Sequence, residues 1–216
     1  TRGICIPNTW MIMKLNRLLE HIDYLEVQGT TDREITGIAF DSRKVEKGMA
    51  FIAQMGMHAD GHEFIEAAIE KGAAAVFCEE CPSASTSGIA FIRVEDSTPV
   101  LGQAAAVFYG FPSRRMKVTG ITGTNGKTSI VTLLYRLFMD MGYKTGLIST
   151  IAYRINDREK NASHTTPNAL KIQQLMAEMV EAGCEFCFME VSSHAVVQKR
   201  IAGIDFQYFP RSPRLP

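Results

Sequence analysis

A glycine-rich loop between an apolar segment and an amphipathic segment constrains this chain more than any other feature. Residues 117–122 are typical of a strand, and Gly123-Thr124-Asn125-Gly126 follow directly. Residues 127–141 then place apolar side chains at helical spacing before Gly142, at Ile130, Leu133, Leu134, Leu137, Phe138 and Met141. At such a junction, backbone N–H groups and a helix N-terminus can hold phosphate. The sequence therefore predicts a nucleotide-binding α/β unit.

The residue types of this loop suit the phosphates of ATP. Glycine lets the backbone approach the anion, Lys127 can reach the terminal phosphates, and the Thr128 hydroxyl is placed to ligate Mg²⁺. The strict phosphate-loop pattern has a glycine where this chain has Ile121, so the loop is a variant. We expect ATP to contact Gly123, Thr124, Asn125, Gly126, Lys127, Thr128 and Ser129. The loop leaves open whether the γ-phosphate goes to water, a hydroxyl or a carboxylate.

An α/β pattern surrounds the loop on both sides. Before it, we expect a helix from residue 14, strands at 35–40, 49–53, 74–78 and 89–94, and helices at 61–71 and 99–109. Residues 110–115 combine turn residues with charge and are predicted to link two domains. After the loop helix, we expect a strand at 145–151, a polar excursion at 154–164, a helix at 168–182 and a strand at 185–191. The predicted fold class is α/β, with an N-terminal domain and an incomplete phosphate-loop domain that has a mainly parallel sheet.

Composition argues against several other classes of protein. Lys plus Arg and Asp plus Glu number 23 each among 216 residues, without charge blocks, so neither nucleic acid nor an anionic membrane is favoured as a partner. No apolar run has the length of a membrane span, and residues 1–13 lack the pattern of a secretory signal. We expect a cytoplasmic monomer. Because the chain opens with Thr1, Met11 or Met13 is the expected natural start, and residues 1–13 a non-native or disordered leader.

Four of the five cysteines form two CxxC pairs, Cys78 with Cys81 and Cys184 with Cys187. Paired CxxC motifs can bind zinc. However, Cys78 ends an apolar run, and Cys184 and Cys187 flank Glu185-Phe186 of a predicted strand, where an odd spacing sends side chains to opposite faces. We therefore expect buried thiols in a reducing compartment in place of a zinc site.

Several motifs resemble those of the Mur ligases, which form the amide bonds of UDP-N-acetylmuramoyl peptides. The sequence GTNGKT from Gly123 is similar to the ATP loop of this family and of the related folylpolyglutamate synthetases. The other motifs start at Asp41 (DSR, then GMAF), at His58 (HADGHEF) and at His164 (HTTP, then EVSSH from Glu190). Together they resemble the members that add the third amino acid, from about residue 15 to residue 205.

The resemblance implies two sets of substrate contacts. In the first domain, Phe40, Ser42 and the turn Met57-His58-Ala59 match family positions that hold the UDP end of the substrate. In the second domain, the matching positions that contact the muramoyl peptide are Thr165, Thr166, Ser192, Gln198 and Arg200. Arginine suits a carboxylate or phosphate partner. Taken singly, several of these residue types also fit a surface turn or a helix cap, so their assignment depends on the resemblance.

Glu190 is the implied metal ligand. It ends a predicted buried strand beside the loop, where a lone carboxylate is costly unless it meets a cation. The resemblance implies that Thr128 and Glu190 bind Mg²⁺, that Lys127 and Glu190 are catalytic, and that ATP and Mg²⁺ are the cofactors. The implied reaction transfers the γ-phosphate to the terminal carboxylate of UDP-N-acetylmuramoyl-L-alanyl-D-glutamate. The amine of L-lysine or meso-diaminopimelate then attacks the acyl phosphate, so the partners are the UDP-muramoyl dipeptide, ATP and a free amino acid.

Family members continue through more of the central sheet and a third domain that binds the amino acid. The resemblance here covers only the front portion, so we expect an inactive fragment. Its expected parts are a UDP-substrate domain at 14–111, a partial ATP-binding domain at 112–205 and an aberrant tail at 206–216. Two alternatives stay open: a UDP-sugar or nucleotide-binding module without catalysis, and another phosphate-loop ligase such as a folylpolyglutamate synthetase. A GTPase-type switch is disfavoured because the chain has no NKxD motif.

Overall fold

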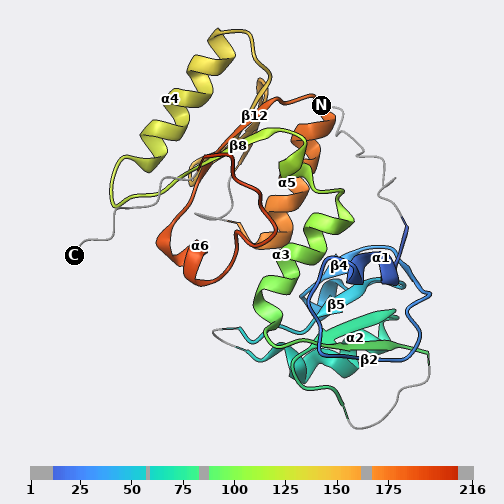
Figure 1. Cartoon of the computed structure of the whole chain (residues 1–216). Coiled ribbons are helices and arrows are strands. Elements are labelled where there is room, and N and C mark those ends of the chain that lie inside the picture. The colour runs from blue at the N-terminus through green and yellow to red at the C-terminus, as the bar shows by residue number, and fades with distance from the viewer. Residues whose placement is uncertain (1–11, 57–58, 83–87, 162–166, 209–216) are drawn as a thin grey trace. The chain divides into compact units, whose positions relative to one another are not determined.

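The chain folds into two compact units, Thr1–Phe108 and Tyr109–Pro216 (Figure 1). The structure, a computed structural model, describes residues 12–56, 59–82, 88–161 and 167–208. Within these ranges, no helix combines the length and apolar composition that a membrane crossing demands.

The first unit is built on a five-stranded sheet in the order β2-β7-β6-β5-β4. Strands β4 to β7 are parallel neighbours, whereas β2 pairs with β7 in the antiparallel direction. A separate antiparallel pair joins β1 and β3. In chain order the elements are β1 (Met13–Lys14), α1 (Leu15–Leu19), β2 (Glu26–Gln28), β3 (Glu34–Ile35), β4 (Ile38–Ala39), η1 (Ser42–Lys44), β5 (Ala50–Ile52), η2 (Gly61–Phe64), α2 (Ile65–Glu70), β6 (Ala75–Cys78), β7 (Ala90–Arg93) and α3 (Ser97–Phe108).

Both faces of this sheet are buried, as the apolar runs at β5 and β6 predict for parallel strands. On one face, Phe51 and Val76 pack with Ile65 and Ala68 of α2. The alternate residue Phe77 is equally buried, and α3 contacts the strands β4, β5 and β6. The four parallel strands therefore have their carboxyl ends at the same edge of a sheet whose central strands are buried on both faces.

The second unit has a five-stranded sheet in the order β11-β10-β9-β12-β8. Strand β12 lies between β8 and β9 and is parallel to both, whereas β10 is antiparallel to β9 and to β11. The elements are η3 (Pro112–Arg114), β8 (Lys117–Ile121), α4 (Lys127–Asp140), β9 (Thr145–Ile148), β10 (Ala152–Ile155), β11 (Arg158–Asn161), α5 (Ala169–Glu181), β12 (Phe186–Glu190) and α6 (Ser193–Val197).

Helices α4 and α5 cover opposite faces of this sheet (Figure 1). Phe188 of β12 packs with Val131 and Tyr135 of α4. Its neighbour Met189 packs with Ile172 and other residues of α5 on the opposite face. This alternation follows from the period of two residues along a strand. The predicted α/β class, with a parallel centre in the second sheet, is confirmed.

Two local predictions for the second unit are wrong. The predicted polar excursion at 154–164 contains most of a hairpin, in which β10 pairs with β11 around Asn156 and Asp157. Asn156 has φ of 50°, the left-handed conformation that asparagine tolerates in two-residue turns. In addition, the thiols of Cys184 and Cys187 pack in the same apolar cluster, since β12 begins only at Phe186 and strand alternation does not extend to Cys184.

Helix α4 forms where the sequence predicts it, but its apolar stripe is only partly buried. Leu134 and Phe138 pack against the sheet with Val131 and Tyr135. Four other apolar side chains of the predicted stripe are exposed: Ile130, Leu133, Leu137 and Met141. The helix therefore carries apolar residues on more of its circumference than the described part of the sheet covers.

Residues beyond α6 return to the edge of the sheet. The backbone N–H of Gln207 donates to the carbonyl of Val118, and the N–H of Gly120 donates to the carbonyl of Tyr208, each at 3.0 Å. The bridge between Thr119 and Tyr208 is parallel. The outer side of β8 is thus hydrogen-bonded at its centre.

Candidate functional site

The loops that follow β8, β9 and β12 meet at one edge of the second sheet. These strands are parallel neighbours, so their carboxyl ends point the same way. Ligands of open α/β sheets bind outside such carboxyl ends. The glycine-rich loop follows β8, Ser149 and Thr150 follow β9, and Glu190 is the last residue of β12. Three segments that are far apart in the sequence thus converge beside the predicted phosphate loop.

The glycine-rich loop leads directly into α4, which begins at Lys127. Gly126 precedes the helix with φ of 78°, a left-handed conformation that strains other residues. No side chain caps the helix, so its first N–H groups point into an exposed loop. The ammonium group of Lys127 donates to the carbonyl of Gly123 at 2.7 Å. The loop therefore places the uncapped start of α4 beside a lysine, which is an arrangement for binding an anion.

A buried carboxylate lies against the first turn of this helix. Glu190 is 4% exposed, and its Oε2 accepts hydrogen bonds from the Thr128 hydroxyl at 3.0 Å and the Thr150 N–H at 3.2 Å. Among the residues that the structure describes, none forms an ion pair with Glu190. A buried carboxylate without a cationic partner is costly. The residues in hand therefore fit a small divalent cation held by oxygen ligands.

The chemistry of these donors matches Mg²⁺ among the common metal ions. Carboxylate and hydroxyl oxygens are its preferred ligands, and phosphate oxygens of a nucleotide usually complete its coordination. Thr128 and Glu190 supply one oxygen of each kind beside the loop. The sequence singled out both residues, and the structure brings them into contact.

Sequence reasoning missed the contribution of the segment after β9. Thr150 donates its N–H to Glu190, and its hydroxyl lies 3.5 Å from that of Thr128. Ser149 is buried and organises this turn, because its hydroxyl donates to the carbonyl of Ala152 and accepts from the N–H of Ala152. The signal was a Ser-Thr pair directly after an apolar strand. Its meaning depends on β9 lying beside β12, which the sequence does not reveal.

The remaining predicted contacts of the second unit follow β12. Ser192 caps α6, since its hydroxyl oxygen accepts from the N–H of Ala195 at 3.1 Å. Gln198 and Arg200 lie at and just beyond the end of that helix, and both are partly buried. Thr165 and Thr166 lie outside the described residues.

The first unit gathers its predicted contacts at the carboxyl edge of its own sheet. Phe40 and Ser42 follow β4, and a turn follows the neighbouring strand β5. In this turn the N–H of Gly56 donates to the carbonyl of Ala59, and Met55 bridges to Asp60. The predicted residues Met57 and His58 lie outside the described residues, whereas Ala59 is exposed.

A hydrogen-bond network holds the base of this turn. Asp60 Oδ1 accepts from the backbone N–H of His62 at 2.9 Å and lies 2.7 Å from its Nδ1. His62 Nε2 accepts from the N–H of Glu79, so its ring carries its proton on Nδ1. The Glu79 carboxylate accepts from the N–H and the hydroxyl of Ser97 at the start of α3. Hydrogen bonds therefore link residues after β5, after β6 and at the start of α3. Asp60 and His62 belong to the motif HADGHEF, whereas Glu79 and Ser97 lie outside it.

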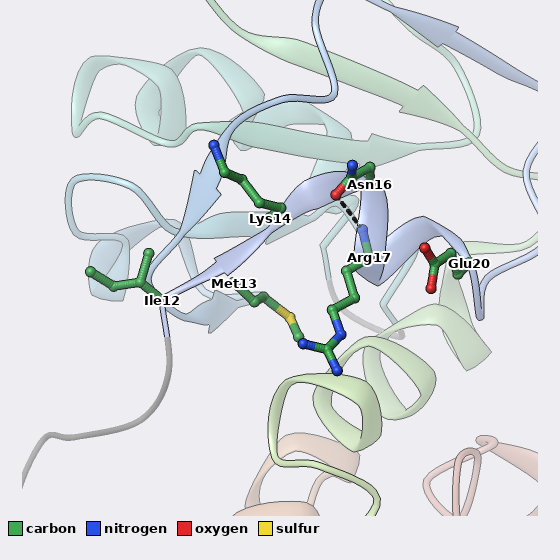
Figure 2. A pocket seen from close by; sticks show the side chains of 6 residues that line it. All are labelled: Ile12, Met13, Lys14, Asn16, Arg17 and Glu20. Carbon is green, nitrogen blue, oxygen red and sulfur yellow. Dashed lines mark hydrogen bonds between the residues drawn. The ribbon is translucent and has the colours of Figure 1, made fainter.

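A cavity of about 380 Å³ lies in the first unit, beside β1 and α1. Figure 2 shows the side chains that line it. Arg17 and Lys14 contribute cationic side chains, and the N–H of Arg17 donates to Asn16 Oδ1 at 2.7 Å. None of the predicted site residues lines this cavity, whose walls are Ile12, Met13, Lys14, Asn16, Arg17 and Glu20.

Comparison with protein families finds two matches along the chain. Residues 34–109 match the model described as "Mur ligase family, catalytic domain". Residues 121–209 match the model of the Mur ligase middle domain. The second match includes the glycine-rich loop, Thr150, Glu190 and the segment that returns to β8.

Individual relatives agree with the family models. The UDP-N-acetylmuramoyl-L-alanyl-D-glutamate–2,6-diaminopimelate ligase of Cytophaga hutchinsonii is 54% identical over 195 residues, which are 90% of this chain and 40% of the relative. The ligase of the same name from Bacteroides fragilis is 48% identical over 194 residues, again 90% of this chain and 40% of the relative. The chain thus spans about 40% of the length of these curated relatives.

A solved structure gives the same result for the fold. A structure of a UDP-N-acetylmuramoyl-L-alanyl-D-glutamate–2,6-diaminopimelate ligase superposes with a TM-score of 0.75 and 25% identity, covering 95% of this chain and 42% of that one. The resemblance inferred from the loop and the later motifs is confirmed by these matches. The chain therefore belongs to the Mur ligase family and contains its N-terminal and middle domains.

Proposed function

We propose that this chain provides the ATP and UDP-substrate sites of a ligase that adds the third amino acid to UDP-N-acetylmuramoyl-L-alanyl-D-glutamate. The observation that carries this proposal is the hydrogen bond between Thr128 and the buried Glu190, which joins the phosphate loop to a cation-seeking carboxylate. The names of the relatives support 2,6-diaminopimelate as the added amino acid. Cytoplasmic ATP and UDP precursors are the proposed substrates.

The proposed reaction converts a poor electrophile into a good one. The γ-phosphate moves to the substrate carboxylate, and the amine of the amino acid then displaces phosphate from the resulting acyl phosphate. Lys127 and the N–H groups at the start of α4 neutralise the negative charge of the phosphates. Thr128 and Glu190 would hold Mg²⁺, which would supply further charge neutralisation. The reaction requires no protein nucleophile.

The substrate is proposed to contact both units. In the first, Phe40, Ser42 and Ala59 lie at the carboxyl edge of the sheet and would hold the UDP end. In the second, Ser192, Gln198 and Arg200 follow β12, which ends at Glu190, and would contact the muramoyl peptide. We propose the same roles for Met57, His58, Thr165 and Thr166.

Calorimetry tests this proposal directly. UDP-N-acetylmuramoyl-L-alanyl-D-glutamate is titrated into the chain, with and without a non-hydrolysable ATP analogue and Mg²⁺, after circular dichroism has shown that the sample is folded. Binding of the UDP compound and Mg²⁺-dependent binding of the analogue are expected. A folded sample that binds the ATP analogue but ignores the UDP compound would overturn the substrate assignment. Binding of neither ligand would overturn both assignments.

We further propose that the 216-residue chain alone does not form the amide bond, because the aligned part of the chain spans only 40% of the length of its Cytophaga hutchinsonii relative. Radiolabelled 2,6-diaminopimelate, ATP and the UDP-muramoyl dipeptide are incubated with the chain, and the Cytophaga hutchinsonii ligase serves as the positive control. Labelled UDP-muramoyl tripeptide in the sample with this chain alone would refute the statement.

A further inference from the structure

The first CxxC pair brings two thiols into contact at the end of β6. The Sγ atoms of Cys78 and Cys81 lie 3.1 Å apart, across a bend formed by Glu79 and Glu80. A disulfide bond is about 2.05 Å long, so the two sulfurs need to approach by about 1 Å to bond. Cys78 is buried in the apolar cluster under α2, and Cys81 packs at its border, partly accessible to solvent.

The second CxxC pair shows that the spacing alone does not create this arrangement. The thiol of Cys184 donates to the side-chain oxygen of Asn156 at 3.5 Å. Cys187 is fully buried within β12. Within the described residues, no hydrogen bond joins these two thiols. The described residues therefore contain one pair whose thiols are in contact and one pair of equal spacing whose thiols share no hydrogen bond.

The surroundings of the converged pair favour redox chemistry over metal binding. A structural zinc site takes four ligands, usually cysteine and histidine. Among the described residues, no cluster of three or more His, Cys, Asp or Glu side chains is arranged to hold a metal ion. Two thiols in contact, one of them accessible, are instead the arrangement of a dithiol that is oxidised transiently in a reducing compartment.

We propose that Cys78 and Cys81 are a redox site, at which small disulfides such as oxidised glutathione form a reversible intramolecular disulfide. The accessible Cys81 thiolate attacks one sulfur of oxidised glutathione and releases one glutathione thiolate. Cys78 then loses its proton and attacks the Cys81 sulfur, which releases the second glutathione. The protein loses two hydrogens, and one oxidised glutathione becomes two reduced molecules.

The difference in burial between the two thiols favours this order. Burial raises the pKa of the Cys78 thiol, and its contact with Cys81 raises it further, so Cys78 is the weaker attacking group in solution. Once Cys81 carries glutathione, Cys78 already lies beside the sulfur that it must attack. Proximity therefore favours closure of the disulfide over accumulation of the mixed disulfide.

The bend between the two cysteines also holds the turn of the first unit. Glu79 donates its N–H to His62, and its carboxylate accepts from Ser97. A disulfide between Cys78 and Cys81 closes a short ring that contains Glu79, the residue that makes both contacts. The redox site is therefore built into the segment that anchors the base of this turn.

The test uses the whole chain with Cys5→Ser, which removes the remaining cysteine. The folded protein is equilibrated with oxidised and reduced glutathione, free thiols are alkylated with iodoacetamide, and peptides are weighed by mass spectrometry. The peptide with residues 78–81 is expected to lose two hydrogens and to resist alkylation until dithiothreitol is added. The pair Cys184 and Cys187 is the internal control and is expected to stay reduced.

Two variants separate the steps. Cys78→Ser is expected to stop at the glutathione adduct of Cys81, whereas Cys81→Ser is expected to leave Cys78 unmodified. Circular dichroism checks the fold of each, and Cys78→Ala replaces Cys78→Ser if the buried hydroxyl prevents folding. The proposal is overturned if the unsubstituted pair accumulates the mixed disulfide, or if both thiols are still reduced and become alkylated after equilibration. It is also overturned if the oxidised cysteines link separate molecules.

Discussion

The hydroxyl of Thr128 lies 3.0 Å from Oε2 of Glu190, and this hydrogen bond joins the first turn of α4 to the last residue of β12. The two residues are 62 positions apart in the sequence. Each is an ordinary polar residue alone, but together they place a hydroxyl and a buried negative charge beside a loop that is suited to phosphate. Several predictions about nucleotide binding depend on this contact.

The substitution Glu190→Gln removes the charge and keeps an oxygen that accepts from Thr128 and Thr150. We expect Mg²⁺-dependent affinity for a non-hydrolysable ATP analogue to fall about 10- to 100-fold, since a charged contact is worth about 1.5–3 kcal/mol. Thermal stability should not fall, because the variant no longer buries an unpaired charge. Calorimetry with and without Mg²⁺ measures the first effect. Glu185→Gln, five residues earlier and exposed, is the control and should change neither.

The substitution Lys127→Met tests the lysine of the loop. Its ammonium group now donates to the carbonyl of Gly123, so phosphate binding exchanges that bond for a charge-assisted one. Affinity for the ATP analogue should fall about 10- to 100-fold, with little change in the urea midpoint. Lys171→Met changes a lysine in the first turn of α5 and should leave nucleotide affinity unchanged. Equal losses in the two variants would count against a specific role for Lys127.

The substitution Gly126→Ala tests the backbone of the loop. An added Cβ meets only the Ile130 side chain, at 4.0 Å, so the cost comes from φ of 78° and amounts to about 1–2 kcal/mol. Gly142→Ala is the matched control, since Gly142 also has positive φ and open space but lies at the far end of α4. Both variants should lose similar stability in urea denaturation. Only Gly126→Ala should also weaken binding of the ATP analogue.

Removal of the His62 ring should destabilise the first unit. His62→Ala leaves the N–H of Glu79 without its acceptor, which costs about 1–3 kcal/mol in a partly buried site. His62→Gln restores an acceptor near the position of Nε2 and should lose less. Urea denaturation followed by circular dichroism measures both changes, and His21→Ala, at an exposed position, is the control. The idea fails if the glutamine variant is as unstable as the alanine variant.

The network around Asp60 should make stability depend on acid pH. Hydrogen bonds from the backbone N–H and then the ring of His62 hold the pKa of Asp60 below its usual value of 3.8. Because the pKa is lower in the folded state, the contribution of Asp60 to stability is fully present above its usual value of 3.8. It is lost as the pH falls from there through the pKa of the folded state. The urea midpoint of Asp60→Asn should therefore change less between pH 6 and pH 3 than that of the unsubstituted chain. Asp23→Asn, at an exposed aspartate, should behave like the unsubstituted chain.

The sequence predicted what local patterns determine. The glycine-rich loop, the start of α4 and the buried strand that ends at Glu190 depend on neighbouring residues, and all three lie where the pattern indicated. The helix α5 begins at Ala169, within one residue of the predicted start at 168, and Asn168 caps it by accepting from the N–H of Lys171. Local turn chemistry and hydrophobic periodicity carry this information.

Features that depend on long-range pairing could not be predicted in the same way. The role of Thr150 requires β9 to lie beside β12, and the order of the strands is set by packing between distant segments. The hairpin of β10 and β11 was missed because β11 (Arg158–Asn161) is entirely polar, so no apolar pattern marks it as a partner of the buried β10. The exposed side of α4, with Leu133 68% exposed, was missed because periodicity shows that a face is apolar but not what covers it.

The position of β12 between β8 and β9 also sets an order of events during synthesis. The phosphate loop leaves the ribosome first, and it has neither its neighbouring strand nor its carboxylate until residue 190 has followed. Because β12 lies between them, β8 and β9 are not hydrogen-bonded to each other in the folded sheet. A nascent chain of this protein should therefore acquire Mg²⁺-dependent nucleotide affinity in a single step, when its last described strand enters the sheet.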